Sequence, residues 1–582
     1  MPIKSSGWRP SAAAFAALLL AACAMPPPVA PPQMAEPTQP AETDTLTGNY
    51  LAARYARSVQ DTGAAAKYFA ASLADDPDNV LLMRRTFILM VASGQVDKGV
   101  EMAQRLVAAG EADPLIPLLL SVADIKAGNF ASAVARMDLA PRTGLNTLIT
   151  PMISAWAQAG DGKVDEAFKA LAPLGENQAL GSIYDYHSGL INEMVGRDDA
   201  AEASYLKILD RGGAGTLRVV EAYARFLQRH GRVTEARALF AAYQQRTPDS
   251  SVAQALVESL AAPASAPLVP NAAAGAAETL YTAAAVLSRE DAGEVVELYL
   301  QLALYLQPQL DAARMLIGDL MENRQNWDDA ITAYRVVPAS SPYYSSARVR
   351  LAWSLNSKGN SDEAIALLRS VVTSPSDRTE ALLMLGDLLR GKERYADAVR
   401  EYDRALARVG TPQPRHWAMF YARGIAYERS KQWPKAEADF LKALQLQPDQ
   451  PQVLNYLGYT WVDRGERLED ARRMIERAVE LRPNDGFIVD SLGWALYRMG
   501  DYEEAVVRLE RAVELQAEDP VINDHLGDAY WRVGRANEAR FQWARSLRLK
   551  PESDARAATE RKLQEGLPPA RQPVPARAAS NG

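Results

Sequence analysis

The sequence contains very little cysteine and histidine. Its 582 residues include one cysteine, Cys23, and four histidines. A single cysteine excludes an intramolecular disulfide and a metal cluster held by several cysteines. The histidines include no pair at the i, i+4 spacing of a metal-binding helix: His187, His230, His416 and His525. We therefore expect neither a metal site nor a bound cofactor.

Motifs of common enzyme active sites are missing as well. The sequence has no Gly-x-Ser-x-Gly motif and no Gly-x-x-x-x-Gly-Lys-Ser/Thr motif, which would indicate a hydrolase nucleophile and a phosphate-binding loop. The run from Gly212 to Gly215 is rich in glycine, but no strand pattern precedes it, so we interpret it as a turn. These observations predict a protein without catalytic residues and without a small-molecule substrate.

Positive charge is also in deficit. The formal net charge is −8 at pH 7. The first 22 residues hold two positive side chains, Lys4 and Arg9, and no acidic ones, so the remaining chain is more acidic still. Binding of nucleic acid requires a basic surface. We expect no nucleic-acid partner.

The first 45 residues have the features of a targeting segment. Lys4 and Arg9 precede an apolar run, 12–20, that is too short to span a bilayer. This pattern predicts a cleaved signal peptide over residues 1–22. The run ends in Leu20-Ala21-Ala22-Cys23, which resembles the lipobox of bacterial lipoproteins. Residues 23–45 are rich in proline, which breaks helices, and predict an extended tether.

The lipobox resemblance implies a lipid-anchored protein. In lipoproteins the signal is cut before the cysteine, which then carries the acyl chains, so we expect lipidation at Cys23. Ala24 stands where an aspartate would favour retention in the inner membrane. The expected location is therefore the periplasmic face of the outer membrane. The alternative is an ordinary signal peptide that leaves a free cysteine.

An alanine followed four residues later by a large apolar residue recurs through the C-terminal half. The alanines are spaced by 34, 34, 38, 35, 34 and 34 residues: Ala330, Ala364, Ala398, Ala436, Ala471, Ala505 and Ala539. A fixed period in this range predicts stacked supersecondary units, that is, a solenoid. The step of 38 residues coincides with residues 410–414, where we expect a longer loop.

Within each period, the small and large residues resemble the tetratricopeptide repeat (TPR). Small residues at positions 8 and 20 let two helices approach closely, larger residues at positions 11 and 24 fill the adjacent space, and proline at position 32 ends the second helix. The last repeat shows the pattern as Leu526-Gly527-x-x-Tyr530, Ala539-x-x-x-Trp543 and Pro551. The resemblance implies an all-α TPR solenoid of antiparallel helix pairs in a right-handed superhelix.

The same frame, extended over the chain, predicts about fourteen repeats in two lobes. A check is position 15, where the first helix should end and where glycine is favoured. Nine repeats have glycine there: Gly94, Gly128, Gly162, Gly196, Gly231, Gly359, Gly465, Gly500 and Gly534. The lobes are predicted at 46–260, ending in a helix from Ser251, and at 277–555. Between them, 261–276 is rich in alanine and proline and predicts a linker, and 556–582 predicts a disordered tail.

In a TPR stack, positions 2, 5, 9, 12 and 13 of the first helix line the concave surface. In the last three repeats, aromatic, acidic, basic and amide side chains at these positions form the predicted protein-binding groove: Asn455, Tyr459, Phe487, Asp490, Trp494, Tyr497, Arg498, Asp524, Asp528 and Trp531. Exposed aromatic residues are enriched at binding hot spots. Two interpretations of Trp494 and Tyr497 remain open here: contact with a partner, or packing against neighbouring helices or a capping tail.

The charge of the predicted groove favours one kind of partner. TPR domains that clamp a carboxylate use lysine and asparagine at positions 5 and 9. Here Asp490 and Asp524 occupy position 5, and Asp528 occupies position 9. A partner segment with apolar and basic or amide character fits this surface better.

One stretch is more specific than a general TPR. It runs from Leu454-Asn455-Tyr456-Leu457-Gly458 through Asp490-Ser491-Leu492-Gly493-Trp494 to His525-Leu526-Gly527-Asp528. It is similar to the C-terminal half of a family of large proteobacterial TPR outer-membrane lipoproteins. That family includes adaptors that bind and activate periplasmic carboxy-terminal processing proteases, which degrade peptidoglycan hydrolases.

This resemblance implies a non-catalytic adaptor whose partners are a processing protease and cell-wall hydrolases. Two alternatives stay open. One is an assembly factor for outer-membrane proteins, pili or polysaccharide export. The other is an enzyme of cell-wall metabolism, which would need polar groups that converge in a pocket.

Overall fold

The computed structural model describes residues 45–210, 216–264, 266–288, 293–373 and 379–569. Regular secondary structure within these ranges is helical only, and none of these helices is long and apolar enough to cross a bilayer. The predictions for the signal peptide 1–22, for Cys23 and for the turn at 212–215 lie outside the described residues. So do most of the tether and the last part of the tail.

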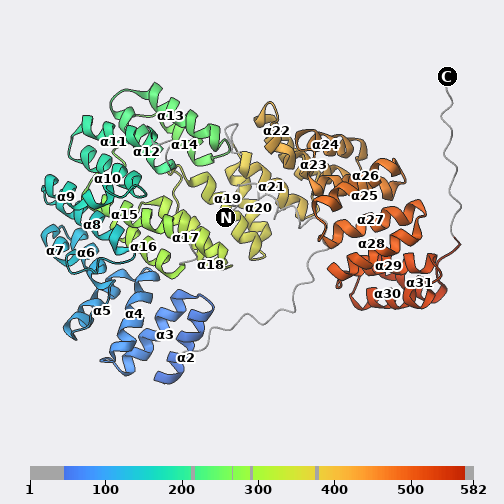
Figure 1. Ribbon diagram of the computed structural model, residues 1–582, viewed down its shortest axis with the longest axis horizontal. Helices are drawn as coiled ribbons and strands as arrows, with labels where there is room; N and C mark the ends of the chain where they lie inside the picture. The colour runs from blue at the N-terminus through green and yellow to red at the C-terminus, as the bar shows by residue number, and fades with distance from the viewer. Residues whose placement is uncertain (1–44, 211–215, 265, 289–292, 374–378, 570–582) are drawn as a thin grey trace, which may run out of the picture. The chain divides into compact units, whose positions relative to one another are not determined.

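The described chain forms two compact units that divide between Leu388 and Leu389, within helix α21 (Thr379–Gly391). Figure 1 labels the helices in chain order. The N-terminal unit contains, before α21, α2 (Leu46–Ser58), α3 (Thr62–Asp75), α4 (Val80–Ala92), α5 (Val96–Ala108), α6 (Ile116–Lys126), α7 (Phe130–Met137), α8 (Asn146–Gly160), α9 (Val164–Gly175), α10 (Gly181–Met194), α11 (Asp198–Asp210), α12 (Leu217–Arg229), α13 (Val233–Arg246), α14 (Ser251–Ser259), α15 (Ala272–Leu287), α16 (Gly293–Leu306), α17 (Asp311–Asn323), α18 (Trp327–Arg335), α19 (Tyr344–Ser357) and α20 (Ser361–Val371). The C-terminal unit contains, after α21, α22 (Tyr395–Val409), the 3₁₀ turn η2 (Pro414–His416), α23 (Trp417–Arg429), α24 (Trp433–Leu446), α25 (Pro451–Arg464), α26 (Leu468–Leu481), α27 (Gly486–Met499), α28 (Tyr502–Leu515), α29 (Pro520–Arg532), α30 (Ala536–Arg548) and α31 (Ser553–Glu565).

Fourteen pairs of successive helices follow the predicted frame, from α2 with α3 to α29 with α30. Glycine at position 8 sets the distance within a pair. A Cβ atom added at Gly493 would lie 2.5 Å from Cγ of Leu509, and one added at Gly424 would lie 2.6 Å from Cε1 of Phe440. Leu509 and Phe440 both occupy position 24, so small and large residues interlock as predicted. The all-α TPR solenoid is confirmed.

Position 15 gives an independent check of the register. All thirteen described residues at this position have positive φ, including the nine predicted glycines and four other residues, Gln60, Gln325, Glu393 and Lys431. The left-handed residue turns the chain back so that the next amide bonds to the helix it has left; after Gly500, Asp501 N donates to Leu496 O at 3.0 Å. The register therefore holds in the N-terminal repeats, where the residue pattern is weaker.

The segment between the two predicted lobes is packed into the N-terminal unit. Helix α14 forms as predicted, and Ser251 Oγ lies 2.6 Å from Ser346 Oγ of α19. Leu268 and Val269 are buried. Helix α15 begins at Ala272, inside the range 261–276, which corrects the predicted linker. The compact units divide in α21 and not at this segment.

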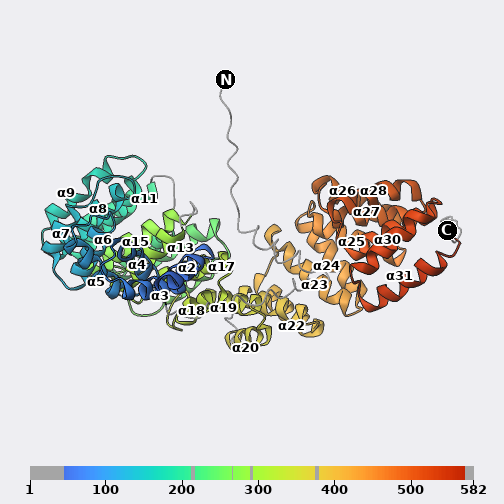
Figure 2. The same cartoon turned by 90° about the horizontal axis from the view of Figure 1, so that it is seen from below.

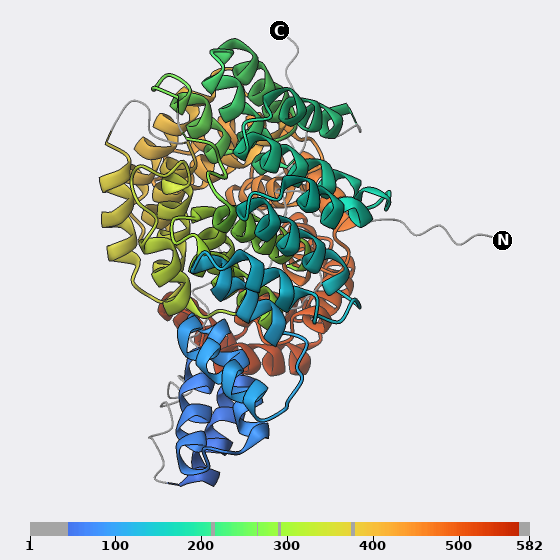
Figure 3. The same cartoon turned by 90° about the vertical axis from the view of Figure 1, so that its left-hand side faces the viewer.

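Helices α15 and α16 pack across the first helices of earlier repeats. Helix α15 contacts α6, α8 and α10, and α16 contacts α4, α5 and α6 (Figures 1 and 3). A side chain at Gly275 would overlap the buried ring of Trp156, so glycine is needed for α15 to approach α8. Glu278 of α15 accepts from Arg218 Nε at 3.1 Å and from the Tyr186 hydroxyl at 3.0 Å. The first-helix surface from α4 to α12 is therefore covered by the same chain.

Helix α31 continues the repeat frame beyond the last pair and packs on α30 (Figure 2). Thr559 Oγ1 donates to Asp524 Oδ1 at 2.9 Å, and this bond repeats the contact of His525 with Asp490 one repeat earlier. Residues 553–565 thus form the first helix of an additional half repeat. This corrects the prediction of a disordered tail from 556, because the described part of that range is largely helical.

Candidate functional site

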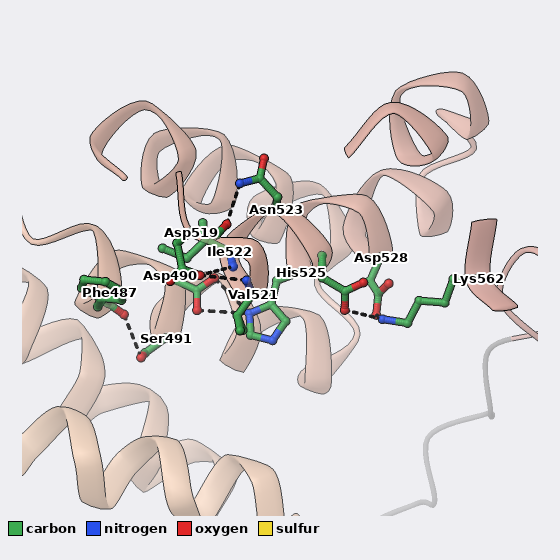
Figure 4. Close-up of polar contacts among 11 residues, drawn as sticks. Phe487, Asp490, Ser491, Asp519, Val521, Ile522, Asn523, His525, Asp528 and Lys562 are labelled. Atoms are coloured by element: carbon green, nitrogen blue, oxygen red, sulfur yellow. Dashed lines mark hydrogen bonds and ion pairs between the residues drawn. The ribbon is translucent and has the colours of Figure 1, made fainter. Parts of the chain in front are cut away.

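The ten predicted groove residues lie on α25, α27 and α29, which contact one another in order. We call the face that these residues form the A-helix surface. An aspartate caps the start of two of these helices. Asp485 accepts from the amides of Phe487 and Ile488. Asp519 accepts from the amides of Val521 and Ile522 of α29 (Figure 4). The geometry thus brings the ten residues together on neighbouring helices.

A stack of three rings lies at the centre of the A-helix surface. The ring centroid of Trp494 is 4.8 Å from that of Tyr497 and 4.1 Å from that of His525, with interplanar angles of 10° and 13°. His525 Nδ1 lies 3.0 Å from Asp490 Oδ1 (Figure 4). Burial acts to lower the pKa of His525, but the charge and hydrogen bond of Asp490 outweigh it and raise the pKa. When it is protonated, His525 presents a cation to the face of the Trp494 indole, a favourable cation–π arrangement.

Three polar atoms of the A-helix surface, on α25 and α27, bond to no other described residue. Asn455 Oδ1 is buried and accepts no hydrogen bond. Trp494 Nε1 and the Tyr459 hydroxyl donate to no other described residue. Burial, together with the charges of Asp490 and Asp463, raises the pKa of Tyr459, which therefore stays a neutral donor. An unsatisfied buried acceptor such as Asn455 Oδ1 costs about 1–3 kcal/mol, and the two unpaired donors offer further sites for bonds from a ligand backbone.

Helix α31 covers the far end of the A-helix surface. Lys562 Nζ lies 2.5 Å from Asp524 Oδ2. It also lies 2.9 Å from Asp528 Oδ2 (Figure 4). Burial acts to lower the pKa of Lys562, but the two aspartates outweigh it and raise the pKa. Trp543 Nε1 also donates to Asp528, at 2.9 Å.

Trp531 is covered as well, because a side chain at Gly566, directly after α31, would overlap its ring. The capping tail therefore covers Asp524, Asp528 and Trp531. These three residues contact the chain itself. Trp494 and Tyr497 are half-buried and pack against the main apolar core, as the packing interpretation predicts.

The remaining predicted residues are half-buried or exposed. Phe487 packs against a small apolar cluster that includes Val489 and Ile522. Arg498 is exposed, and its Nη2 donates to the carbonyl of Asp463 at 3.3 Å. The open part of the A-helix surface consists of Asn455, Tyr459, Phe487, Trp494, Tyr497 and Arg498.

The sequence prediction missed His525 and Lys562, which hold the A-helix surface together. The histidines were considered only as metal ligands. Among the described residues no three His, Cys, Asp or Glu side chains are grouped to hold a metal ion. The sequence did contain a usable signal for His525. It occupies position 6 of its repeat, and Asp490 occupies position 5 of the preceding repeat, so the two side chains meet between adjacent first helices.

Three family models match segments of the chain. Models described as Tetratricopeptide repeat, TPR repeat and Tetratrico peptide repeat match residues 317–379 with 383–451, 493–534, and 182–266, respectively. The matches fall in both units. The match at residues 493–534 includes α29 and the second half of α27.

Curated relatives are similar over part of the chain. A TPR repeat-containing protein of Pseudomonas aeruginosa is 28% identical over 197 residues, which cover 34% of this chain and 32% of that protein. A protein O-mannosyl-transferase of Homo sapiens is 26% identical over 176 residues, 30% of this chain and 20% of that protein. Superkiller complex protein 3 of Mus musculus is 31% identical over 132 residues, 22% of this chain and 8% of that protein. The chain thus spans at most about a third of the length of these relatives.

Solved structures are also similar to this chain. A tetratricopeptide repeat protein from Parabacteroides merdae has a TM-score of 0.36 and 14% identity, over 44% of this chain and 97% of that protein. The Cut9–Hcn1 hetero-tetramer of APC/C has a TM-score of 0.38 and 12% identity, over 90% of this chain and 97% of that chain. The fourteen helix pairs, the interlocking residues at positions 8 and 24 and the family matches together identify the chain as a tetratricopeptide repeat protein.

Proposed function

We propose that this TPR protein is a lipid-anchored adaptor that binds a protein segment on the A-helix surface. The observation that carries the proposal is the set of unpartnered atoms, Asn455 Oδ1, Trp494 Nε1 and the Tyr459 hydroxyl, on the same surface as three stacked rings. Rings supply apolar contact area at low entropic cost, and the polar atoms can bond to a peptide backbone. In the N-terminal unit the equivalent surface from α4 to α12 is covered by α15 and α16.

The proposed location is the periplasmic face of the outer membrane. It is supported by the resemblance of Leu20-Ala21-Ala22-Cys23 to a lipobox and by the proline-rich residues after it. Several acyl chains on Cys23 would suffice for stable anchoring, whereas one chain is marginal. Cys23→Ala should abolish incorporation of a labelled fatty acid, and continued labelling would contradict the anchor.

The proposed partner is a carboxy-terminal processing protease, which the adaptor recruits and activates against peptidoglycan hydrolases. The support is the similarity of residues 454–528 to the family of TPR lipoproteins that includes such adaptors. A scaffold that holds protease and hydrolase together raises the concentration of each near the other. The role needs no catalytic group on this chain.

The test is affinity purification from detergent-solubilised envelopes with the full lipoprotein as bait. We expect a processing protease and cell-wall hydrolases with the unaltered chain, and their loss with Trp494→Ala combined with Tyr459→Phe. Phe541→Ala is the matched control, because Phe541 lies on α30 with 57% of its surface exposed and is not part of the A-helix surface. Recovery that is equal in all three baits would contradict the surface, and recovery of assembly or export machinery instead would contradict the partner.

A further inference from the structure

The chain that follows α31 stays on the A-helix surface. Gly566 ends the helix with a φ of 75° and lies against Trp531. Leu567 packs against the main apolar core of the C-terminal unit. Arg532 Nη1 then donates to the carbonyl of Pro568 at 2.6 Å. The chain is therefore held in place up to the last residues described.

Pro568 lies one side chain away from the ring stack. The same Arg532 that holds its carbonyl donates through Nε to the Tyr497 hydroxyl at 3.3 Å. Tyr497 in turn stacks on Trp494. The described chain thus reaches the edge of the open part of the A-helix surface, next to its aromatic centre, at Pro568.

The composition of residues 570–582 complements that surface. They include Pro573, Pro575, Arg571 and Arg577 and no acidic residue. Prolines dock on aromatic side chains, and arginines stack on rings or pair with carboxylates. The Asp463 side chain is 67% exposed, and its Oδ1 lies 3.7 Å from Nη1 of Arg498, so an arginine of the tail would share this carboxylate. Proline also removes backbone donors and leaves carbonyl acceptors. Trp494 Nε1 and the Tyr459 hydroxyl are donors of the kind that such a backbone needs.

We propose that residues 570–582 bind across the A-helix surface of their own chain, over Trp494 and Tyr459, and compete there with the protein partner. Residues 570–582 are long enough to reach both residues from Pro568. Thirteen extended residues span about 40 Å, and packed helices lie about 10 Å apart, so α27 and α25 are both accessible from Pro568. The inference rests on the A-helix surface as a peptide-binding surface but not on the identity of the partner.

The test is binding of a fluorescent peptide of residues 569–582 to two forms of the protein, the full chain and a chain that ends at Pro569. We expect saturable binding to the shortened chain by fluorescence anisotropy. Binding to the full chain should be at least about tenfold weaker, because its own tethered segment competes at an effective concentration on the millimolar scale. Trp494→Ala should weaken binding by about tenfold or more, and Phe541→Ala should leave it unchanged.

A second comparison does not depend on the folding of any protein variant. A peptide with Pro573→Gly, Pro575→Gly, Arg571→Ala and Arg577→Ala should lose most of its affinity for the shortened chain. Equal binding of both peptides, or equal binding to both chains, would overturn the proposal. So would absence of saturation up to about 1 mM, the scale of a tethered segment.

Light scattering separates binding within one chain from exchange between two. The full chain should be no larger an oligomer than the shortened one. A dimer that disappears on shortening would place the segment on a second copy and overturn the proposal. If the peptide fails to bind while the envelope purification still recovers a partner that is sensitive to Trp494→Ala, this inference falls and the proposed function stands.

Discussion

The contact between Gly493 and Leu509 allows a prediction about stability. Gly493→Ala should destabilise the chain when Leu509 is present and stabilise it when Leu509 has been replaced by alanine. A Cβ atom at Gly493 would lie 2.5 Å from Cγ, 2.8 Å from Cδ2 and 3.3 Å from the backbone nitrogen of Leu509. The first two atoms belong to a side chain that a second substitution can remove. The third is only slightly too close, so the helices themselves tolerate a methyl group.

The magnitudes follow from packing and helix propensity. Overpacking at Gly493→Ala costs about 1–3 kcal/mol, and alanine recovers about 1 kcal/mol of helix propensity over glycine. We expect a net loss of roughly 1 kcal/mol in the free energy of opening of α27 and α28. Leu509 is fully buried, so Leu509→Ala alone should cost about 2–5 kcal/mol. In the Leu509→Ala background, Gly493→Ala partly fills the cavity and should stabilise by about 1 kcal/mol, a coupling of about 2 kcal/mol.

The assay is native-state hydrogen exchange read on peptides from α27 and α28, because repeat arrays open locally and a global unfolding midpoint would mix several transitions. Gly391→Ala is the control, since nothing lies within 4 Å of an added Cβ there. Its effect should be the same with Leu509 intact and in the Leu509→Ala background. If Gly493→Ala has the same sign in both backgrounds, the interlocking of positions 8 and 24 is not what holds this pair.

Three further predictions concern single side chains. Lys562→Met removes the cation shared by Asp524 and Asp528 and should release α31 at a cost of about 2 kcal/mol, visible as faster amide exchange across that helix; unchanged exchange would mean that the pair is not coupled to docking. Lys431→Gly should stabilise α23 and α24 by about 1 kcal/mol, because Lys431 has a φ of 60°, and exchange of those helices should slow. The free energy of opening of α27 and α29 should be lower at pH 8.5 than at pH 6, measured by amide exchange corrected for its intrinsic pH dependence. The pKa of His525 is raised in the folded state, so its contribution is complete below the unfolded pKa of about 6.5 and is lost as pH rises through the folded pKa. His525→Gln should remove that difference between the two pH values, and a difference that persists would assign it to other groups.

The repeat architecture could be predicted because its causes are local. Glycine at position 8, alanine at position 20 and a left-handed residue at position 15 each act within one helix pair, so a single sequence displays them. The frame also locates position 15 where it is not a glycine. Gln60 and Glu393 have the same positive φ as the glycines that occupy this position in other repeats.

The 34-residue repeat pattern could not predict that α15 packs on α8 or that α31 packs on the last repeat. Gly275 and Trp156 meet across more than a hundred residues, and nothing in the 34-residue pattern pairs them. For α31, the tail was interpreted from its proline and alanine content, although residues 553–565 are strong helix formers. Continuing the frame would have placed Thr559 on Asp524 as His525 lies on Asp490.

The aromatic centre of the A-helix surface was predicted, but its electrostatics were not. Position rules put Trp494 and Tyr497 on one face because their spacing is that of a helix. They cannot show that Lys562 neutralises Asp524 and Asp528, since that pairing depends on a helix outside the last full repeat. The partner preference inferred from charge therefore rests on Asp463, because Asp490 is buried against His525 and the last two aspartates pair with Lys562.

The packing of α16 against the first repeats has a consequence for how the N-terminal unit folds. Arg57 donates to Glu294, 237 residues later, Thr62 donates to Glu297, 235 residues later, and Tyr305 donates back to Asp97 over 208 residues. A solenoid held only by neighbouring repeats can unravel from its ends. Here the first repeats cannot detach without breaking contacts made late in the sequence, so the N-terminal unit should open as one cooperative body. Its early repeats also cannot complete their packing during synthesis until α16 has been made, which predicts a slow, high-contact-order step in an otherwise locally folding chain.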